Sequence, residues 1–282
     1  MSPLISAAEL KALLATSPDV LVCDCSFDLT EPQAGARAFA AAHVPGAVYV
    51  HVDKDLSAAK TGLNGRHPLP ERAWFAARMA ELGVNQSTWV IACDNAGGMY
   101  AARLWWMLRW IGHAGVRVLD GGVPAWRAAG GEMESGAAVA RPAGDLALRP
   151  SLVEMVDFAE LRSTLGRGRR LIVDARAADR FRGENETLDP VAGHIPGAAN
   201  RFFRDNLGAD GAFKPAAQLR AEWLEVMAGR APTDLVQHCG SGVTGCHNLL
   251  AMEAAGLSGA RLYPGSWSEW CAQPGAPVAI GS

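Results

Sequence analysis

The feature that most constrains the fold of this chain is an internal repeat, because much of its first half recurs in its second half. The segment 43–47, with the sequence His-Val-Pro-Gly-Ala, returns 151 residues later as His-Ile-Pro-Gly-Ala at 194–198. The apolar run Val20–Asp24 returns as Leu171–Asp174 at a shift of 150 residues. Further matches, at a shift of 144 residues, join Gly112, Gly121 and Trp126 to Gly256, Gly265 and Trp270. We therefore expect one domain that is present twice.

Each copy alternates short apolar runs with helical segments. The runs Trp89–Cys93 and Leu235–His238 are typical of buried strands, and Ser6 and Asp157 each stand three residues before a glutamate, as residues that begin helices often do. Strands that alternate with helices predict an α/β fold with a mainly parallel sheet and helices on both faces. A glycine- and alanine-rich linker lies between the copies, so we expect domains at residues 1–140 and 141–282.

Composition and charge exclude several classes of protein. The 282 residues include 26 basic and 29 acidic side chains, a formal net charge of −3, without long runs of one sign, which argues against nucleic acid or a membrane surface as a partner. The N-terminus lacks a basic leader, and no apolar stretch reaches the roughly 18 residues of a membrane span. Six cysteines are too few for a disulfide framework, so we expect a cytoplasmic protein in a reducing compartment.

The chemistry is expected at Cys239, which ends an apolar strand and begins a glycine-rich loop. A helix is predicted to begin around Thr244, so the loop N–H groups and the positive end of the helix can stabilise a thiolate there. At the 144-residue shift Cys239 falls on Asn95, which predicts that the first copy is catalytically silent. We expect the loop to bind the substrate through Gly240, Gly242, Val243, Thr244 and Gly245.

Three chemistries could use this cysteine. A cysteine phosphatase needs an arginine six positions after it, and that position is Gly245, so the phosphate clamp is missing. A metal site built from His238, Cys239, Cys246 and His247 is disfavoured, because adjacent strand residues point to opposite faces and the spacing lacks the pattern of a zinc site. We therefore expect no metal and favour covalent sulfur transfer, in which the loop holds a persulfide anion.

Taken together, these motifs resemble the tandem rhodanese-like sulfurtransferases, the family that contains thiosulfate sulfurtransferase and 3-mercaptopyruvate sulfurtransferase. The resemblance covers nearly the whole chain and implies a silent N-terminal and a catalytic C-terminal domain, with Cys239 as the sulfur carrier. It rests on the paired His-x-Pro-Gly-Ala motifs, residues 97–106 and 119–122, Asp174-Ala-Arg176, Arg180-Phe-Arg-Gly183, the Cys239 loop and residues 263–270.

The resemblance also implies roles for individual side chains. Relatives that prefer thiosulfate have Arg and Lys directly after the cysteine, whereas this loop has Gly240 and Ser241, as in mercaptopyruvate-type relatives. In those relatives the loop serine joins a histidine and an aspartate in a proton relay, and His67 and Asp53 fill these places here.

Two arginines are expected to bind the substrate anion. Arg180 matches the family's anion-binding arginine, and Arg182 is a candidate second one, because the family's usual second position holds Asp189. By contrast His43 and His194, which occur in both copies, are expected to fix turns by bonding to the backbone.

These residues predict a ping-pong enzyme that moves sulfur from 3-mercaptopyruvate to a thiol, such as thioredoxin or glutathione, or to cyanide. Thiosulfate is the alternative donor, and a sulfur-carrier or redox-sensing module without efficient turnover is the alternative of another class. No cofactor is expected.

Overall fold

The computed structural model describes residues 2–168 and 170–281 of the chain. These residues form two compact units, and each unit includes a short segment from the other half of the sequence. The first unit comprises Met1–Ser57, Pro70–Leu152 and Gly208–Phe213; the second comprises Ala58–Leu69, Val153–Leu207 and Lys214–Ser282. Residues 141–152, assigned to the second domain on sequence, pack with the first unit.

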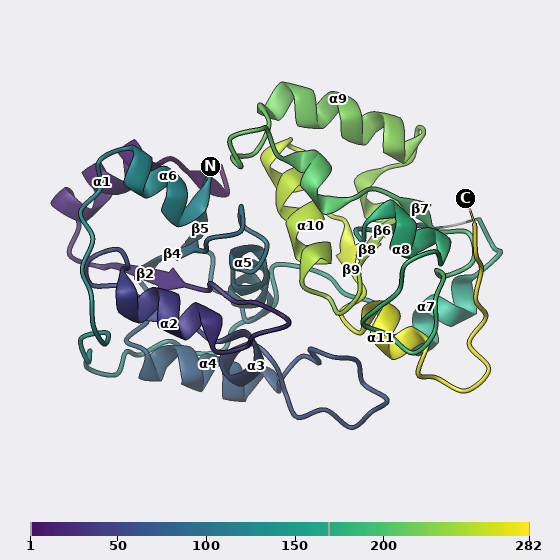
Figure 1. The fold of residues 1–282 in the computed structure, drawn as a ribbon, viewed down its shortest axis with the longest axis horizontal. Helices are drawn as coiled ribbons and strands as arrows, with labels where there is room; N and C mark the ends of the chain where they lie inside the picture. The colour runs from purple at the N-terminus through teal and green to yellow at the C-terminus, as the bar shows by residue number, and fades with distance from the viewer. Residues whose placement is uncertain (1, 169, 282) are drawn as a thin grey trace. The chain divides into compact units, whose positions relative to one another are not determined.

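The first unit contains a five-stranded sheet with the strand order β1-β5-β4-β2-β3, and every pair in it is parallel. Helices lie on both sides of the strands (Figure 1), because a parallel sheet needs a crossover segment between neighbouring strands. Its elements are β1 (Leu4–Ile5), α1 (Ala7–Thr16), β2 (Val20–Asp24), α2 (Ala34–Ala41), β3 (Val48–Tyr49), α3 (Val52–Asp55), α4 (Arg72–Glu81), β4 (Trp89–Cys93), α5 (Ala101–Trp110), β5 (Val116–Leu119) and α6 (Gly122–Ala128).

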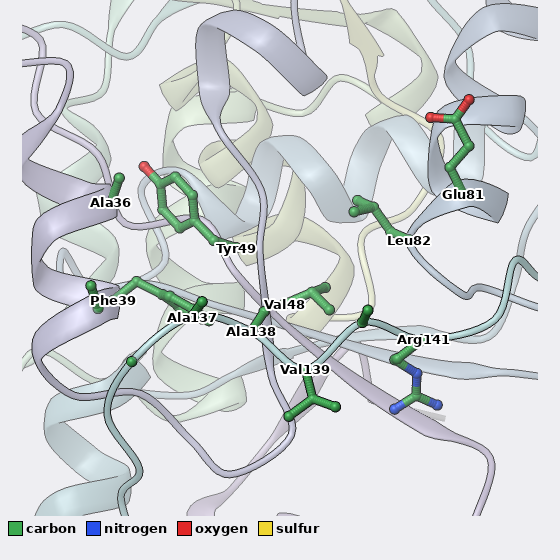
Figure 2. A pocket seen from close by; sticks show the side chains of 13 residues that line it. Ala36, Phe39, Val48, Tyr49, Glu81, Leu82, Ala137, Ala138, Val139 and Arg141 are labelled. Carbon is green, nitrogen blue, oxygen red and sulfur yellow. The ribbon is translucent and has the colours of Figure 1, made fainter.

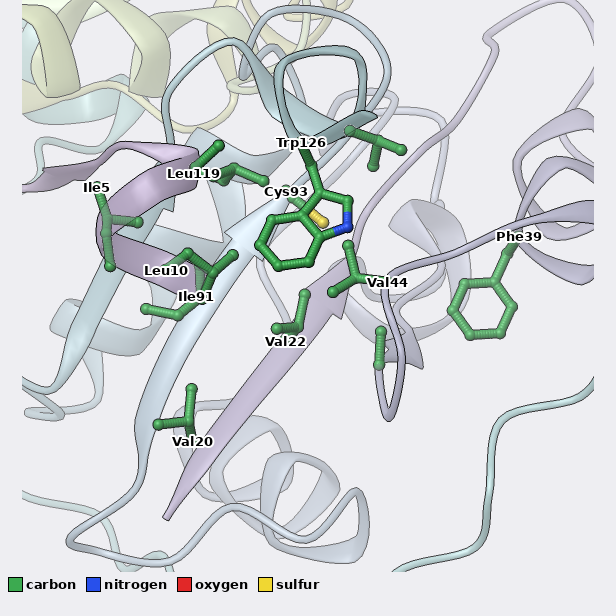
Figure 3. Packing of buried hydrophobic residues seen from close by; sticks show 13 residues of the cluster. Ile5, Leu10, Val20, Val22, Phe39, Val44, Ile91, Cys93, Leu119 and Trp126 are labelled. Atoms are coloured by element: carbon green, nitrogen blue, oxygen red, sulfur yellow. The ribbon is translucent and has the colours of Figure 1, made fainter. Parts of the chain in front are cut away.

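Alternate residues of β2 and β4 form one face of the first unit's core. Val22 and Cys93 lie there with Val44 and Trp126 (Figure 3), and these side chains are at most 4% exposed. The intervening strand residues, such as Leu21, are also buried, which shows that the sheet is covered on both faces. The predicted α/β architecture is therefore confirmed.

The second unit contains a four-stranded parallel sheet with the order β7-β6-β8-β9. Its apolar core includes Val236 of the sheet and the fully buried Trp267 and Trp270. Its elements are α7 (Phe158–Thr164), β6 (Leu171–Asp174), α8 (Ala178–Arg182), β7 (Ala199–Asn200), the 3-10 helix η1 (Phe203–Asn206), α9 (Ala216–Met227), the 3-10 helix η2 (Pro232–Asp234), β8 (Leu235–His238), α10 (Thr244–Ala254), β9 (Arg261–Leu262) and α11 (Ser266–Trp270).

The repeated histidines fix turns in the backbone, as the sequence predicts. His43 Nδ1 lies 2.7 Å from the Phe39 carbonyl oxygen, and His194 Nδ1 lies 2.8 Å from that of Phe181. The ring of His43 also stacks on Phe39, and the ring of His194 stacks on Phe181. In both pairs the ring centroids are 3.8 Å apart. These contacts assign both histidines to the scaffold of the repeated domain.

A cluster of charges ties α9 to the preceding loop in the second unit. The Glu222 carboxylate accepts hydrogen bonds from Arg201, from Lys214 Nζ at 2.9 Å and from Gln218 Nε2 at 3.0 Å. Partial burial alone would raise the pKa of Glu222, but these donors outweigh it and lower the pKa to about 2.

Across residues 2–168 and 170–281 the structure contains no helix that is both long and apolar enough to cross a membrane.

Candidate active site

Cys239 lies at the carboxyl end of β8, where the chain turns from the strand into α10. The turn needs glycine, because Gly242 has φ 76°, a left-handed conformation that side chains disfavour. Gly245 is needed for close packing, since a Cβ there would lie 3.3 Å from the Cα of His238. The helix begins at Thr244, as predicted, so its N-terminus is turned towards the loop that starts at Cys239.

Hydrogen bonds to the start of α11 hold the cysteine in place. The Cys239 N–H donates to Ser266 Oγ at 3.1 Å, and the Cys239 carbonyl accepts from the Trp267 N–H at 2.9 Å. Ser266 adopts φ 54°, a strained conformation for a residue with a side chain. Cys239, the candidate nucleophile, is only 2% exposed, and the start of α11 supports its backbone.

The first unit has a corresponding loop, and the sheet register identifies its counterpart of Cys239. Asp24 pairs with Cys93, and Asp174 pairs with His238, so the residue after each partner is equivalent: Asp94 and Cys239. The predicted counterpart, Asn95, is therefore wrong by one residue. The loop differs in length between the copies, so a constant shift counted along the sequence does not preserve the register of the strands.

Asp94 shows what the loop backbone does with an anion. Its buried carboxylate accepts four backbone N–H groups at 2.8–2.9 Å, from Ala96, Gly98, Tyr100 and Ala101. In the second unit the N–H of Ser241 points at Cys239 Sγ from 3.5 Å, as the N–H of Ala96 points at Asp94. A left-handed glycine follows in both loops, Gly97 in one and Gly242 in the other. The shared start of the two loops is therefore suited to a negatively charged group.

The structure brings His67 and Ser241 together. His67 Nδ1 lies 2.7 Å from Ser241 Oγ. Both residues are buried: His67 is 3% exposed and Ser241 is 6% exposed. His67 reaches this position because its segment, Ala58–Leu69, packs with the second unit although it precedes α4 in sequence. Asp53, the third predicted member of the relay, belongs to α3 of the first unit, and its role stays a prediction.

Arg180 extends from α8 towards the cysteine loop. Its guanidinium bonds to Glu186 at 2.8 Å, and a Cβ added to Gly240 would lie 3.6 Å from it. Arg182, the other predicted substrate-binding arginine, forms an exposed ion pair with Glu184 at 2.7 Å instead. Its role in binding also stays a prediction.

Sequence reasoning missed two residues at this site. Glu186 bridges Arg180 and the buried Arg176, and Arg66 lies next to Gly240. Neither stands in a motif, and the contacts that bring them to the site form only in the folded chain. The position of Arg66 directly before His67 is the one available signal.

Behind the loop lies a buried charge network. Arg176 bonds to Asp174 at 2.7 Å and to Glu186 at 3.3 Å, and all three side chains are at most 2% exposed. Burial lowers the pKa of His238, and the carboxylate of Asp174, 3.6 Å from its Nε2, opposes this shift. The network fixes the carboxyl ends of β6 and β8 and supports the strand that carries Cys239.

Metal-ligating side chains and cavities are the other features of the molecule that bear on function. Among the described residues no group of three or more His, Cys, Asp or Glu side chains could hold a metal ion. The first unit contains a cavity of about 420 Å³ between α2, β3 and the segment 136–141, with Tyr49, Glu81 and Arg141 in its wall (Figure 2). Its described lining includes neither cysteine nor histidine.

The assembled residues can therefore perform thiol chemistry on a small anion. Cys239 supplies the sulfur nucleophile, the loop N–H groups and the helix N-terminus favour negative charge on it, and Arg180 can bind a carboxylate. The Ser241–His67 pair can carry a proton to or from a reacting group.

Comparison with known proteins identifies the family. A model described as "Rhodanese-like domain" matches residues 6–129 and 157–273. A "Probable 3-mercaptopyruvate sulfurtransferase" of Pseudomonas aeruginosa is 47% identical over 280 residues, which cover 99% of this chain and 98% of that protein. A "Thiosulfate/3-mercaptopyruvate sulfurtransferase 2" of Arabidopsis thaliana is 30% identical and covers 99% of this chain and 87% of its own.

Solved structures agree with this result. The crystal structure of SseA from Escherichia coli, a 3-mercaptopyruvate sulfotransferase by its description, superimposes with a TM-score of 0.83. It is 30% identical, and the match covers 95% of this chain and 99% of that one. The chain therefore belongs to the rhodanese-like sulfurtransferase family, as its sequence motifs predict, and carries two copies of the family's domain.

Proposed function

We propose that this sulfurtransferase takes sulfur from 3-mercaptopyruvate and passes it on through a persulfide of Cys239. The observation that carries the proposal is the placement of Cys239 between an anion-favouring loop and the hydrogen-bonded pair Ser241–His67. The names of the Pseudomonas and Escherichia relatives support the same donor.

In the first half-reaction the Cys239 thiolate attacks the sulfur of 3-mercaptopyruvate, forming a sulfur–sulfur bond while the carbon–sulfur bond breaks. The electron pair of the broken bond stays with the methylene carbon, which leaves as part of the enolate of pyruvate. The proton of the donor thiol is then delivered to this carbon. We expect the hydrogen-bonded pair Ser241–His67 to move this proton, with Asp53 as the further member that the family resemblance implies. The products are pyruvate and a Cys239 persulfide anion, which the N–H groups of residues 240–245 stabilise.

In the second half-reaction an acceptor attacks the outer sulfur of the persulfide and restores the Cys239 thiolate. A small thiol such as glutathione, a protein thiol such as thioredoxin, or cyanide can serve. All six cysteines of the chain are free, which suits a cytoplasmic enzyme whose reducing surroundings keep Cys239 reactive and supply thiol acceptors.

Mass spectrometry of the protein after incubation with 3-mercaptopyruvate and without acceptor tests the mechanism. A covalent persulfide adds one sulfur atom, about 32 Da, to the peptide that contains Cys239. The Cys239→Ser variant should neither gain this mass nor release pyruvate, whereas Cys271→Ser, at a half-buried cysteine outside the loop, should behave like the wild type. Turnover by Cys239→Ser would exclude the proposed mechanism.

Thiosulfate is the second candidate donor, favoured by the Arabidopsis relative, whose name includes both donors. The ratio of kcat/KM for the two donors decides between them, because specificity is set by that ratio. If the protein loads one sulfur and does not turn over with thioredoxin, glutathione or cyanide, it is a carrier or sensor of sulfur instead.

A further inference from the structure

Arg66 occupies a defined place beside the nucleophile loop. It directly precedes His67 in the segment Ala58–Leu69, which packs with the second unit. Its backbone N–H donates to Ser268 Oγ at 3.0 Å, and its guanidinium forms an ion pair with Asp189, whose side chain is 2% exposed. The Arg66 side chain itself is 23% exposed, so it is held from one side and open on another.

Two guanidiniums lie next to the residue that follows Cys239. A Cβ built on Gly240 would lie 2.6 Å from Nη2 of Arg66 and 3.6 Å from Nη2 of Arg180. We propose that Arg66 is a second anion-binding residue of this site and that it binds the donor's carboxylate together with Arg180. This inference rests on the proposed function, since it assigns the group that recognises the 2-oxo acid donor.

Asp189 determines how much negative charge the site accepts. It contacts both arginines, with its Oδ2 3.4 Å from Arg180, so it orients Arg66 and cancels part of its charge. Glu186 does the same for Arg180. These two carboxylates therefore offset part of the positive charge of the two guanidiniums before a donor binds. The site therefore favours a donor with one carboxylate over a small dianion such as thiosulfate.

Kinetics of Arg66 variants provide the first test. Losing one charge-assisted hydrogen bond to a carboxylate should raise KM for 3-mercaptopyruvate on the order of tenfold in Arg66→Gln, with a smaller change in kcat. Arg66→Lys keeps the charge and should recover part of the loss. Arg230→Gln, at an exposed arginine after α9, is the matched control and should be unchanged.

A charge-balanced double variant separates direct contact from net charge. Arg66→Gln with Asp189→Asn removes one positive and one negative group, so the net charge equals that of the wild type. Direct binding by the guanidinium predicts that KM stays high in the double variant. Recovery of the wild-type KM would overturn the assignment, as would an unchanged KM in Arg66→Gln alone.

Alkylation of Cys239 tests the same residue without sulfur transfer. Iodoacetate carries a carboxylate and iodoacetamide does not, so the ratio of their rates at Cys239, followed by peptide mass spectrometry, measures anion binding beside the thiol. The ratio should fall about tenfold in Arg66→Gln and stay constant in Arg230→Gln. If the wild type did not use 3-mercaptopyruvate but the ratio fell, the donor would be wrong and the anion site correct. A constant ratio in Arg66→Gln would refute the anion site itself.

Discussion

Replacing Asp94 by Asn should destabilise the first unit strongly, although the two side chains have nearly the same shape. The carboxylate is fully buried and accepts four backbone N–H groups at 2.8–2.9 Å, two on each oxygen. Asparagine offers one oxygen, so at least two N–H groups would face an NH₂ group that cannot accept. At about 1.5–3 kcal/mol for each charge-assisted bond, the loss is about 3–6 kcal/mol. A domain's whole stability is about 5–15 kcal/mol.

Urea unfolding followed by tryptophan fluorescence measures this loss. The shift in the urea midpoint, multiplied by the slope of the transition, gives the change in the free energy of unfolding. Asp28→Asn is the matched control, because Asp28 also accepts backbone N–H groups, at 2.7 and 3.1 Å, but is exposed, so its midpoint should barely move. A loss below about 1 kcal/mol for Asp94→Asn would show that the loop backbone does not depend on an anion. The contacts of Asp94 would then no longer indicate that the Cys239 loop favours negative charge.

Three further substitutions test other parts of the site and fold. Ser241→Ala removes the bond to His67 and should lower kcat on the order of tenfold to a hundredfold with KM little changed; steady-state pyruvate release measures this, and an unchanged kcat would exclude the relay. Gly240→Ala places a Cβ 2.6 Å from the flexible end of Arg66, so the protein should fold with a normal melting temperature yet show a raised KM for the donor; an unchanged KM would contradict the contact. Glu222→Gln should lower the melting temperature at pH 7. Because the pKa of Glu222 falls from 4.5 to about 2 on folding, this carboxylate stabilises the fold above pH 4.5 and ceases to do so as the pH falls towards 2. The difference from the wild type should therefore shrink over that range, and a constant difference would assign the effect to packing.

The sequence predicted those parts of the structure that local chemistry determines. The strand Leu235–His238 and the start of α10 at Thr244 lie where the apolar run ends and the glycines begin. The turn roles of His43 and His194 followed from their presence in both copies, including the copy without a cysteine loop. The strand and helix boundaries depend on neighbours within a few residues along the chain, whereas the roles of the histidines depend on the repeat.

What the sequence could not predict depends on contacts between distant segments. The ion pair of Arg66 and Asp189 joins residues 123 positions apart, and neither residue differs from an ordinary loop residue until the chain is folded. The equivalence of Asp94 and Cys239 is set by hydrogen bonding between strands, so a count of residues along the sequence missed it by one. The relay partner His67 was predicted only through the family resemblance, since no spacing rule joins it to Ser241.

The two copies also differ at the strand that ends in an aspartate. Asp24 and Asp174 occupy equivalent positions and each accepts the backbone N–H two residues on, at 2.8 and 2.9 Å. Burial raises the pKa of Asp24. Burial opposes ionisation of Asp174 as well, but His238 and Arg176 outweigh it and lower the pKa of Asp174.

The copy with Arg176 can thus keep buried charges beside its loop, and this network extends through Glu186 to Arg180 at the nucleophile. The first unit has Ser26 where the second has Arg176, and four backbone N–H groups of its loop bind the carboxylate of Asp94. The loop of the first unit has Asp94 where the loop of the second unit has Cys239, so this nucleophile is missing from the first loop. Because Ser26 stands where the second unit has Arg176, we expect that a cysteine placed at position 94 would not by itself create a second substrate site.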